Sequence, residues 1–274
     1  MNAYGGHQGL IHGLHETLHT RQLQNLLELS PDVEAVSDSV QDDDSPAVLA
    51  EHVAARLREV LAGTKPEHRV ELTNAILANL SADLVEPGPT QLLSLFPTES
   101  LKRRQLRRPS TPLRKPALLT NGKDDPNLAA ELRAEMGSAN RVDLLCAFIR
   151  WTGLRLLEPA LEDARDRGIP IRVITSTYMG ATERRAIDEL VLKYGAEVRI
   201  NYETHATRLH AKAWLFRRDT GFDTAYVGSS NLSAPAMLDG LEWNVKLSSV
   251  GTPDLLRKFE ITFDSYWEIG RAHV

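Results

Sequence analysis

Hydrophobic positions in the first hundred residues recur every three or four places, a spacing typical of helices that bury one face. Three stretches show this spacing, and we expect helices over residues 10–29, 47–62 and 67–80. Pro31 would end the first helix, and Pro46, after an acidic run, would lie in the first turn of the second. The pattern therefore predicts a small helical N-terminal region over residues 1–85.

Proline interrupts this pattern, since residues 86–126 hold seven of the fourteen prolines in the chain. The same stretch carries seven lysines and arginines between Lys102 and Lys115. We expect a proline-rich basic linker over residues 86–124 that separates two domains. Two interpretations of its charge stay open: contact with DNA phosphates, or a solvated linker kept soluble by charge.

Short apolar runs alternate with helical spacing from about residue 125 onward. We expect strands over residues 142–149, 171–175, 197–201, 209–216, 224–228 and 242–247. We expect helices over residues 127–138, 153–167, 181–194, 234–238 and 253–267. This alternation predicts an α/β fold over residues 125–267, in which helices flank a mixed sheet with parallel strand pairs.

The last seven residues, 268–274, continue none of these elements. We expect them to be non-native and the natural chain to continue beyond Trp267 with other sequence. They are left out of the predicted fold.

The composition is that of an ordinary globular protein, with 42% hydrophobic and 25% charged residues. The single cysteine, Cys146, lies in an apolar strand, where we expect it in the core, and it cannot form an internal disulfide. No apolar run approaches the ~18 residues of a membrane span, and the N-terminus has no signal-peptide pattern. We therefore expect a cytoplasmic protein without a membrane partner.

Charge is unevenly divided along the chain. Residues 1–100 hold five basic and fifteen acidic residues, whereas residues 101–274 hold 27 basic and 22 acidic ones. The first part would repel a polyanion, while the second part permits a substrate that carries phosphate.

Candidate chemistry is concentrated where one predicted strand follows another. His210 and Lys212 alternate with small apolar residues, so on a strand they share one face. The next strand ends in Gly228-Ser-Ser-Asn231, a turn of small residues whose backbone can approach a ligand closely. The sequence thus brings an imidazole, an ammonium and an amide to the ends of neighbouring strands.

These groups suit the cleavage of a phosphodiester. A neutral imidazole, that of His210, can attack phosphorus and hold a covalent phosphoryl intermediate. Lys212 supplies a fixed positive charge, while Asn231 and the hydroxyl of Ser229 or Ser230 donate hydrogen bonds where negative charge develops. We predict that these residues bind the phosphate.

A carboxylate is also needed to hold the tautomer of the catalytic histidine. Glu242, at the start of a predicted strand, is the best-placed acid in the sequence. The four predicted catalytic residues are therefore His210, Lys212, Asn231 and Glu242, and their chemistry requires neither a metal ion nor another cofactor.

The pattern His210-x-Lys212 followed by Gly228-Ser-x-Asn231 resembles the HxK…GSxN signature of the phospholipase D superfamily, over roughly residues 125–267. The resemblance implies a phospholipase D-like mixed sheet. The family's usual aspartate would fall five residues after Lys212, where this chain has Arg217. The departure is similar to the nuclease branch of the superfamily, in which a later glutamate orients the histidine, and this favours Glu242.

The resemblance also implies a partner, because a family active site uses two histidines and this chain carries one motif. We expect a homodimer in which His210 of each copy contributes to one site. The stretch is most similar to the nuclease domain at the front of bacterial restriction-type helicases. No GxxxxGK[ST] loop occurs in the chain, so a helicase or other ATPase segment would lie beyond it.

Three functions follow from these observations. The first is a metal-independent nuclease acting on DNA, as a module of a larger restriction or repair helicase. The second is a lipid phosphodiesterase of the same fold. The third is an inactive module for DNA binding and dimerisation, for which Arg217 is the strongest argument.

For several other residues, a structural role is favoured over a functional role or stands beside it. His12, His15 and His19 have metal-site spacing on the first predicted helix, but no carboxylate or cysteine set accompanies them, which favours a polar surface stripe. Trp151 and Trp243 fit either the core or a substrate groove, and Trp243 directly follows Glu242. His205 fits a loop that lines the cleft.

Overall fold

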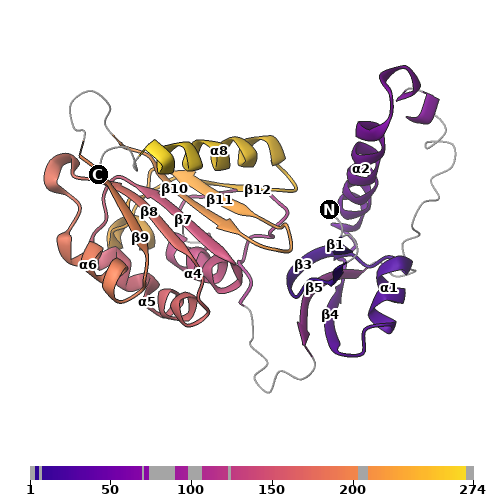
Figure 1. The fold of residues 1–274 in the computed structure, drawn as a ribbon, viewed down its shortest axis with the longest axis horizontal. Coiled ribbons are helices and arrows are strands. Elements are labelled where there is room, and N and C mark those ends of the chain that lie inside the picture. The colour runs from indigo at the N-terminus through magenta and orange to yellow at the C-terminus, as the bar shows by residue number, and fades with distance from the viewer. Residues whose placement is uncertain are drawn as a thin grey trace. The chain divides into compact units, whose positions relative to one another are not determined.

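The computed structural model describes residues 4–5, 8–69, 71–73, 90–97, 107–122, 125–202 and 209–269 (Figure 1). The chain divides into two compact units, Met1–Arg104 and Gln105–Val274. The division falls inside the predicted linker.

The first unit combines two helices with a small sheet. Its strands are β1 (Tyr4–Gly5), β2 (Gln8–Leu10), β3 (Gly13–Leu18), β4 (Val33–Ser39) and β5 (Thr90–Pro97), and its helices are α1 (Arg21–Glu28), α2 (Ser45–Gly63) and the short η1 (Pro66–His68). β1 pairs with β2, while β3, β5 and β4 form an antiparallel sheet in that order. Leu23 of α1 packs against Leu92 and Leu95 of β5 to form a core.

The helix predicted over residues 10–29 is wrong in its first half. Residues 13–18 form β3, and the helix begins only after Thr20, whose hydroxyl accepts a hydrogen bond from Leu23 N at 3.2 Å. Leu14 and Leu18 are both buried. A spacing of four places two residues on one face of a strand as well as of a helix, so it did not distinguish the two.

The rest of the N-terminal prediction holds in part. α2 confirms the helix predicted over residues 47–62, and residues 71–73 are helical, while most of the stretch 67–80 lies outside the described residues. The region is not purely helical, because β4 and β5 complete its sheet. β5 lies inside the stretch predicted as a linker.

The second unit is built on a seven-stranded mixed sheet. Its strands are β6 (Ala117–Leu119), β7 (Arg141–Cys146), β8 (Ile171–Ser176), β9 (Glu197–Asn201), β10 (Lys212–Arg217), β11 (Thr224–Gly228) and β12 (Asn244–Ser248). Its helices are α4 (Leu128–Ser138), α5 (Trp151–Asp166), η2 (Tyr178–Gly180), α6 (Arg184–Leu192), α7 (Ala234–Leu238) and α8 (Pro253–Ile269). The strand order is β6-β12-β11-β10-β7-β8-β9, with β7, β8 and β9 parallel and the other neighbours antiparallel.

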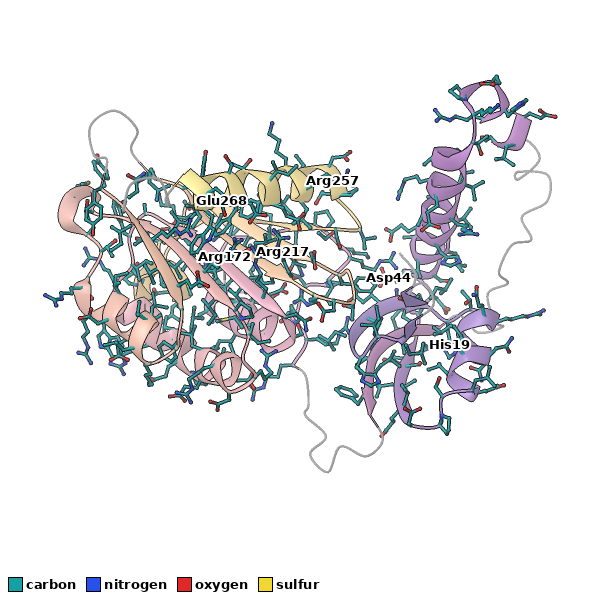
Figure 2. All side chains as sticks on the ribbon, viewed as in Figure 1. His19, Asp44, Arg172, Arg217, Arg257 and Glu268 are labelled. Carbon is teal, nitrogen blue, oxygen red and sulfur yellow. The ribbon has the colours of Figure 1, made fainter. Side chains whose placement is uncertain are left out.

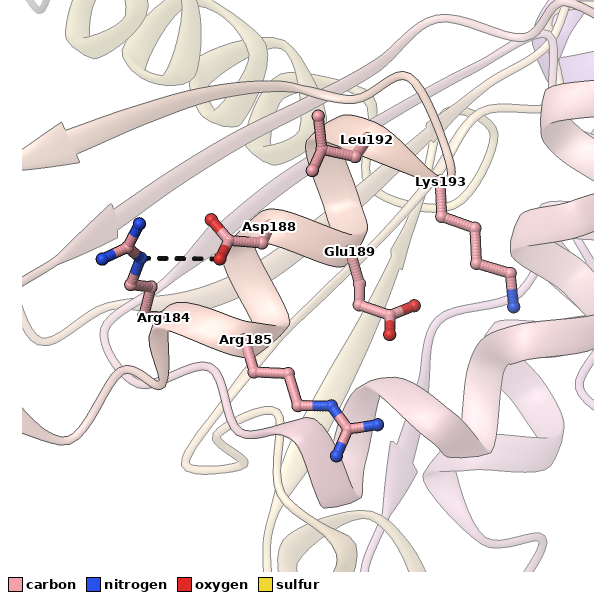
Figure 3. A pocket seen from close by; sticks show the side chains of 6 residues that line it. All are labelled: Arg184, Arg185, Asp188, Glu189, Leu192 and Lys193. Atoms are coloured by element: carbon pink, nitrogen blue, oxygen red, sulfur yellow. Dashed lines mark ion pairs between the residues drawn. The ribbon is translucent and has the colours of Figure 1, made fainter.

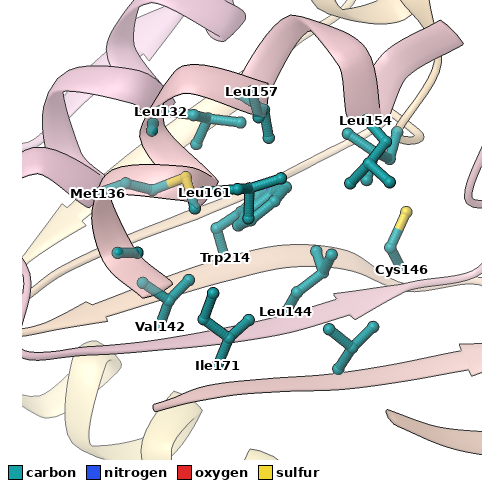
Figure 4. Packing of buried hydrophobic residues seen from close by; sticks show 14 of the residues in the cluster. Leu132, Met136, Val142, Leu144, Cys146, Leu154, Leu157, Leu161, Ile171 and Trp214 are labelled. Carbon is teal, nitrogen blue, oxygen red and sulfur yellow. The ribbon is translucent and has the colours of Figure 1, made fainter. Parts of the chain in front are cut away.

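Helices cover the two faces of this sheet, so the predicted α/β architecture is confirmed (Figure 1). On one face, α4 and α5 pack against strand residues that include Val142, Leu144 and Trp214 (Figure 4). On the other face, Phe263 and Trp267 of α8 pack against a second set of strand residues. The period-two alternation of each strand supplies both cores.

The strand β6 and the residues before it correct the predicted linker. Leu113 is fully buried, Arg114 is 7% exposed, and β6 pairs with β12. Part of the predicted basic linker is therefore a packed element of the second unit, whereas residues 101–106 lie outside the described residues.

The C-terminal helix also extends beyond its predicted end. α8 includes Glu268 and Ile269, which belong to the predicted tail, and residues 270–274 lie outside the described residues. Among the helices of the described part of the chain, none has the length and apolar character needed to cross a membrane.

Candidate active site at one end of the sheet

Three neighbouring strands bring the predicted residues to the same end of the sheet. β10 begins at Lys212, β11 ends at Gly228, and β12 begins at Asn244. Because these strands are antiparallel neighbours, the start of β10, the end of β11 and the start of β12 lie together. His210, the turn after β11 and Glu242 therefore lie at one sheet end, as predicted.

His210 and Lys212 are in direct contact. Lys212 Nζ lies 2.9 Å from Nδ1 and 3.1 Å from Nε2 of His210, and it donates to the backbone oxygen of His210 at 2.7 Å. An ammonium can donate only to an unprotonated ring nitrogen, so the tautomer of His210 decides which of the two nitrogens can accept. His210 is exposed, whereas Lys212 is only 7% exposed. The pair thus offers an accessible imidazole beside a largely buried cation.

Burial lowers the pKa of Lys212 from its ordinary value, while the charges of Cys146 and Glu242 act in the opposite direction. Cys146 lies opposite Lys212 on β7, and burial raises the pKa of its thiol to about 11. The thiol is therefore neutral near pH 7, so of these two groups it is Glu242 that opposes the effect of burial on the pKa of Lys212.

The turn after β11 is fixed by close backbone contacts. A Cβ on Gly228 would lie 2.2 Å from the backbone oxygen of Trp243, so only glycine fits there. Ser229 N donates to that same oxygen at 3.1 Å, and Trp243 N donates to Ser229 Oγ at 3.1 Å. Ser229 is exposed, and its hydroxyl donates to the carboxylate of Glu242. The turn therefore presents a hydroxyl that Glu242 polarises.

Ser230 does not fit its predicted role in binding substrate. It is 4% exposed, and its hydroxyl accepts from Asn244 Nδ2 at 2.8 Å and donates to the backbone oxygen of Ala236 at 3.3 Å. Successive residues of an extended chain point to opposite sides, so when Ser229 faces solvent Ser230 faces inward. Ser230 supports the turn from inside.

Asn231 carries a buried side-chain oxygen, Oδ1, that has no hydrogen-bond partner within the described part of the chain. An unpaired buried amide oxygen is unfavourable, so this atom is suited to a donor from outside the chain. The next residue holds the turn in place, because Leu232 N donates to Phe148 O at 3.2 Å and Leu232 O accepts from Arg150 N at 2.8 Å. A Cβ on Gly153 would lie 2.4 Å from Leu232, so α5 approaches the turn as closely as glycine allows.

Glu242 does not contact the histidine as predicted. Among the described residues its carboxylate accepts from Ser229 and forms no hydrogen bond with His210. Glu242 precedes β12, which is separated from β10 by β11, so about 10 Å of sheet lies between the two backbones. Its effect on the site within one chain passes through Ser229 and through its charge near Lys212.

Phe148, which contacts His210, and Tyr178, which stacks on Phe148, are aromatic residues that the sequence analysis did not single out. The Phe148 ring meets the imidazole edge-on, with centroids 5.9 Å apart, and it stacks on Tyr178 at 6.1 Å. Phe148 follows β7 and Tyr178 follows β8, so the parallel pairing of these strands brings them together. The available signal was their place at the carboxyl ends of buried parallel strands, where functional residues gather in α/β sheets.

Arg217, which occupies the usual aspartate position, lies at the far end of β10. About 17 Å of extended strand separates it from Lys212. Arg217, which Figure 2 labels, forms ion pairs with Asp264 at 3.3 Å and with Glu260 at 3.9 Å, both on α8. Arg217 therefore belongs to an ion-pair network under α8, and its charge does not lie in the candidate site.

Other predicted or visible features lie apart from this site. A hollow on α6 is lined by Arg184, Arg185, Asp188, Glu189, Leu192 and Lys193 (Figure 3). It contains an ion pair of 3.5 Å between Arg184 and Asp188 and none of the predicted site residues. The predicted histidine stripe does not form, because His15 lies buried on β3 rather than on a helix. His205 lies outside the described residues.

Most of the second unit matches a known protein family. Residues 132–267 match the family described as "Cardiolipin synthase, PLD-like domain". This range contains all six predicted site residues, and the predicted phospholipase D-like domain is thereby confirmed. No match was found among curated proteins.

Solved structures similar to the chain include two bacterial proteins. NucT from Helicobacter pylori is 16% identical, with 56% of this chain and 96% of that chain covered and a TM-score of 0.44. Nuc from Salmonella typhimurium, a phospholipase D family member, is 17% identical, with 56% and 94% covered and a TM-score of 0.41. Yeast tyrosyl-DNA phosphodiesterase is 17% identical, with 49% and 32% covered and a TM-score of 0.32.

Proposed function

We propose that this phospholipase D-like domain is a metal-independent phosphodiesterase that cleaves DNA through a covalent phosphohistidine at His210. The observation that carries the proposal is the contact between the exposed imidazole of His210 and the buried ammonium of Lys212. It supplies a nucleophile and a fixed positive charge at one point, at the sheet end where the turn that carries Ser229 and Asn231 also lies.

In the first step, a ring nitrogen of His210 attacks phosphorus, and the nitrogen–phosphorus bond forms as the bond to the leaving strand oxygen breaks. Lys212 stabilises the negative charge on the non-bridging oxygens, and the Asn231 amide nitrogen donates to them. The Ser229 hydroxyl donates to them when it exchanges its bond to Glu242 for one to the phosphate. The leaving oxygen takes a proton from a second histidine. Water then attacks phosphorus, returns a proton to that histidine and releases His210.

The second histidine is proposed to be His210 of a second copy related by a two-fold axis. This proposal rests on the single HxK motif of the chain and on the exposure of His210. A mixing experiment tests it, in which active protein is equilibrated with an excess of the inactive His210→Ala variant. A shared site predicts that activity falls as mixed dimers form, whereas activity independent of the added variant would contradict it.

The catalytic proposal is tested by cleavage of a labelled DNA strand. His210→Ala should abolish cleavage while far-UV circular dichroism stays unchanged, and Lys212→Met should lower kcat by at least a hundredfold. Lys258→Met on α8 is the matched control, because it removes an exposed lysine distant in sequence from the site and should leave cleavage unchanged. EDTA should also leave the rate unchanged, and a strict requirement for Mg²⁺ would refute the mechanism.

A lipid phosphodiesterase is a second candidate, because an apolar surface lies beside the site. Val227, Val245 and Leu118 are aligned across three strands and are 39%, 43% and 47% exposed. Cleavage of phosphatidyl headgroups in vesicles, with no cleavage of DNA, would favour this candidate. DNA binding without turnover and without a trapped phosphohistidine would favour an inactive binding module.

The wider setting is proposed from the sequence resemblance, as the nuclease module of a restriction or repair helicase. Sequencing the natural gene beyond the codon for Trp267 tests this directly. Helicase motifs there would support the proposal, and a stop codon or an unrelated domain would contradict it.

A further inference from the structure

Trp243 combines a fixed backbone with an exposed ring at the edge of the candidate site. Both of its backbone polar groups are hydrogen bonded to Ser229, at 3.1 Å each. Its side chain is nevertheless 65% exposed. Large aromatic side chains stabilise a fold most when they are buried. An exposed indole on an anchored backbone instead offers a flat surface to a ligand.

The position of Trp243 ties it to the catalytic residues. It directly follows Glu242, whose carboxylate accepts from Ser229 and whose charge acts on Lys212. β12, which begins one residue later, is two strands from β10, a distance of about 10 Å. The hydrogen bonds between Trp243 and Ser229, a proposed phosphate ligand, place Trp243 at the edge of the candidate site.

Apolar and cationic side chains lie on opposite faces of the sheet near Trp243. Val245 and Val227 lie opposite each other and are 43% and 39% exposed, which extends the apolar surface away from the site. Lys212 and the exposed Arg150, whose backbone nitrogen holds the turn after Asn231, supply positive charge at the site.

We propose that Trp243 stacks on a nucleobase next to the cleaved phosphodiester and so selects substrates with unpaired nucleotides. The inference rests on the proposed nuclease function and names its substrate class. A nucleotide joins an anion and a flat ring in one unit, and every base has a face on which an indole can stack. A base within a duplex is already stacked on both faces, so it is unavailable to Trp243 unless the strand opens.

The test measures binding of full-length protein to a fluorescent single-stranded oligonucleotide, with His210→Ala present in every sample to prevent cleavage. Trp243→Ala should weaken binding roughly 5- to 150-fold, the range for loss of one base–aromatic stack. Trp243→Phe should recover most of the affinity because it retains a ring. Leu241→Ala is the matched control: it removes a neighbouring apolar side chain that is 93% exposed and should change affinity less than twofold.

Duplex DNA and two further measurements distinguish the competing explanations. Binding of a fully paired duplex should respond to Trp243→Ala less than twofold. Equal losses for Trp243→Ala and Leu241→Ala would overturn the proposal in favour of a general apolar contact. Dissociation of a dimer by Trp243→Ala would assign the ring to a protein interface, and selective loss of binding to anionic vesicles would assign it to lipid; each result overturns base stacking.

Failure of the proposed function is recognised separately. If the protein with His210 intact neither binds nor cleaves any DNA or RNA, the nuclease function and the stacking proposal both fail. If it cleaves single strands and Trp243→Ala leaves affinity and KM unchanged, only the stacking proposal fails.

Discussion

Replacing Glu135 by glutamine should destabilise the second unit severely, because this side chain is the anion of a fully buried ion cluster. Glu135 on α4 pairs with Arg218 and lies 3.3 Å from Lys246 Nζ on β12. Its oxygens also accept from Thr224 Oγ1 and from the Tyr226 hydroxyl, at 2.8 Å each. One carboxylate thus connects α4 to the strands that carry the candidate site.

The magnitude follows from the burial of the three charges. The side chains of Glu135 and Lys246 are 0% exposed and that of Arg218 is 1% exposed. Removing one partner of a buried ion pair costs about 3–5 kcal/mol, because the remaining charge cannot be hydrated. A domain has about 5–15 kcal/mol of total stability, so the variant should retain only part of it.

Urea denaturation followed by tryptophan fluorescence measures this loss in the second unit alone, because all four tryptophans lie there: Trp151, Trp214, Trp243 and Trp267. With a slope of about 2 kcal/mol per molar urea, the midpoint should fall by about 2 M. Glu158→Gln makes the same chemical change in a surface pair with Lys193, where the side chains are 36% and 34% exposed. That control should lose less than about 1 kcal/mol.

The pH dependence of the same measurement gives a second test. Burial raises the pKa of Glu135, but Arg218 and Lys246 outweigh it and hold the pKa below its ordinary value. The stabilisation from the charged carboxylate is therefore present above the ordinary pKa of a glutamate and is lost as the pH falls through the lowered value. Wild type and Glu135→Gln should converge in acid. A loss at pH 7 no larger than that of Glu158→Gln would refute the reasoning.

Three further predictions concern the site and its surroundings. Gly228→Ala should abolish DNA cleavage and lower the melting temperature, because its Cβ would lie 2.2 Å from the backbone oxygen of Trp243; a cleavage assay and a thermal melt measure both. Cys146, whose pKa burial raises to about 11, should react with iodoacetamide at pH 8 at least a hundredfold more slowly in folded protein than in urea, as followed by mass spectrometry. Arg217→Gln should lower the unfolding free energy by about 1 kcal/mol through its lost ion pairs and leave kcat/KM for DNA unchanged, since it lies far from Lys212; a loss of cleavage would contradict this placement.

The second unit was predictable because its strands are nearly continuous apolar runs and its helices are long enough to show their period. Val142 to Cys146 illustrates this, since a run buried on both faces has few alternative conformations. β6 was missed because three residues among prolines carry no period of their own, and β12 supplies their hydrogen bonds. In the first unit, Leu14 and Leu18 fit both a strand and a helix, so only pairing with β5 decides between them.

The candidate site was predictable in its chain-local parts. A strand's alternation places His210 beside Lys212, and small residues allow the turn after β11. Phe148 and the inward orientation of Ser230 depend instead on contacts between elements distant in the chain. The distance between Glu242 and His210 could not be predicted from their separation along the chain, because that separation does not reveal that β11 lies between them in the sheet.

The antiparallel order of β10, β11 and β12 explains how one short stretch of chain brings the candidate site residues of one copy to the same end of the sheet. Each turn returns the chain to the same end of the sheet, so residues at strand ends meet without a long connection. At the other end of β10, Arg217 contributes to stability by forming an ion pair with Asp264 of α8. The charge of Arg217 therefore acts on the attachment of α8, and DNA cleavage by Arg217→Gln tests whether this position matters for activity.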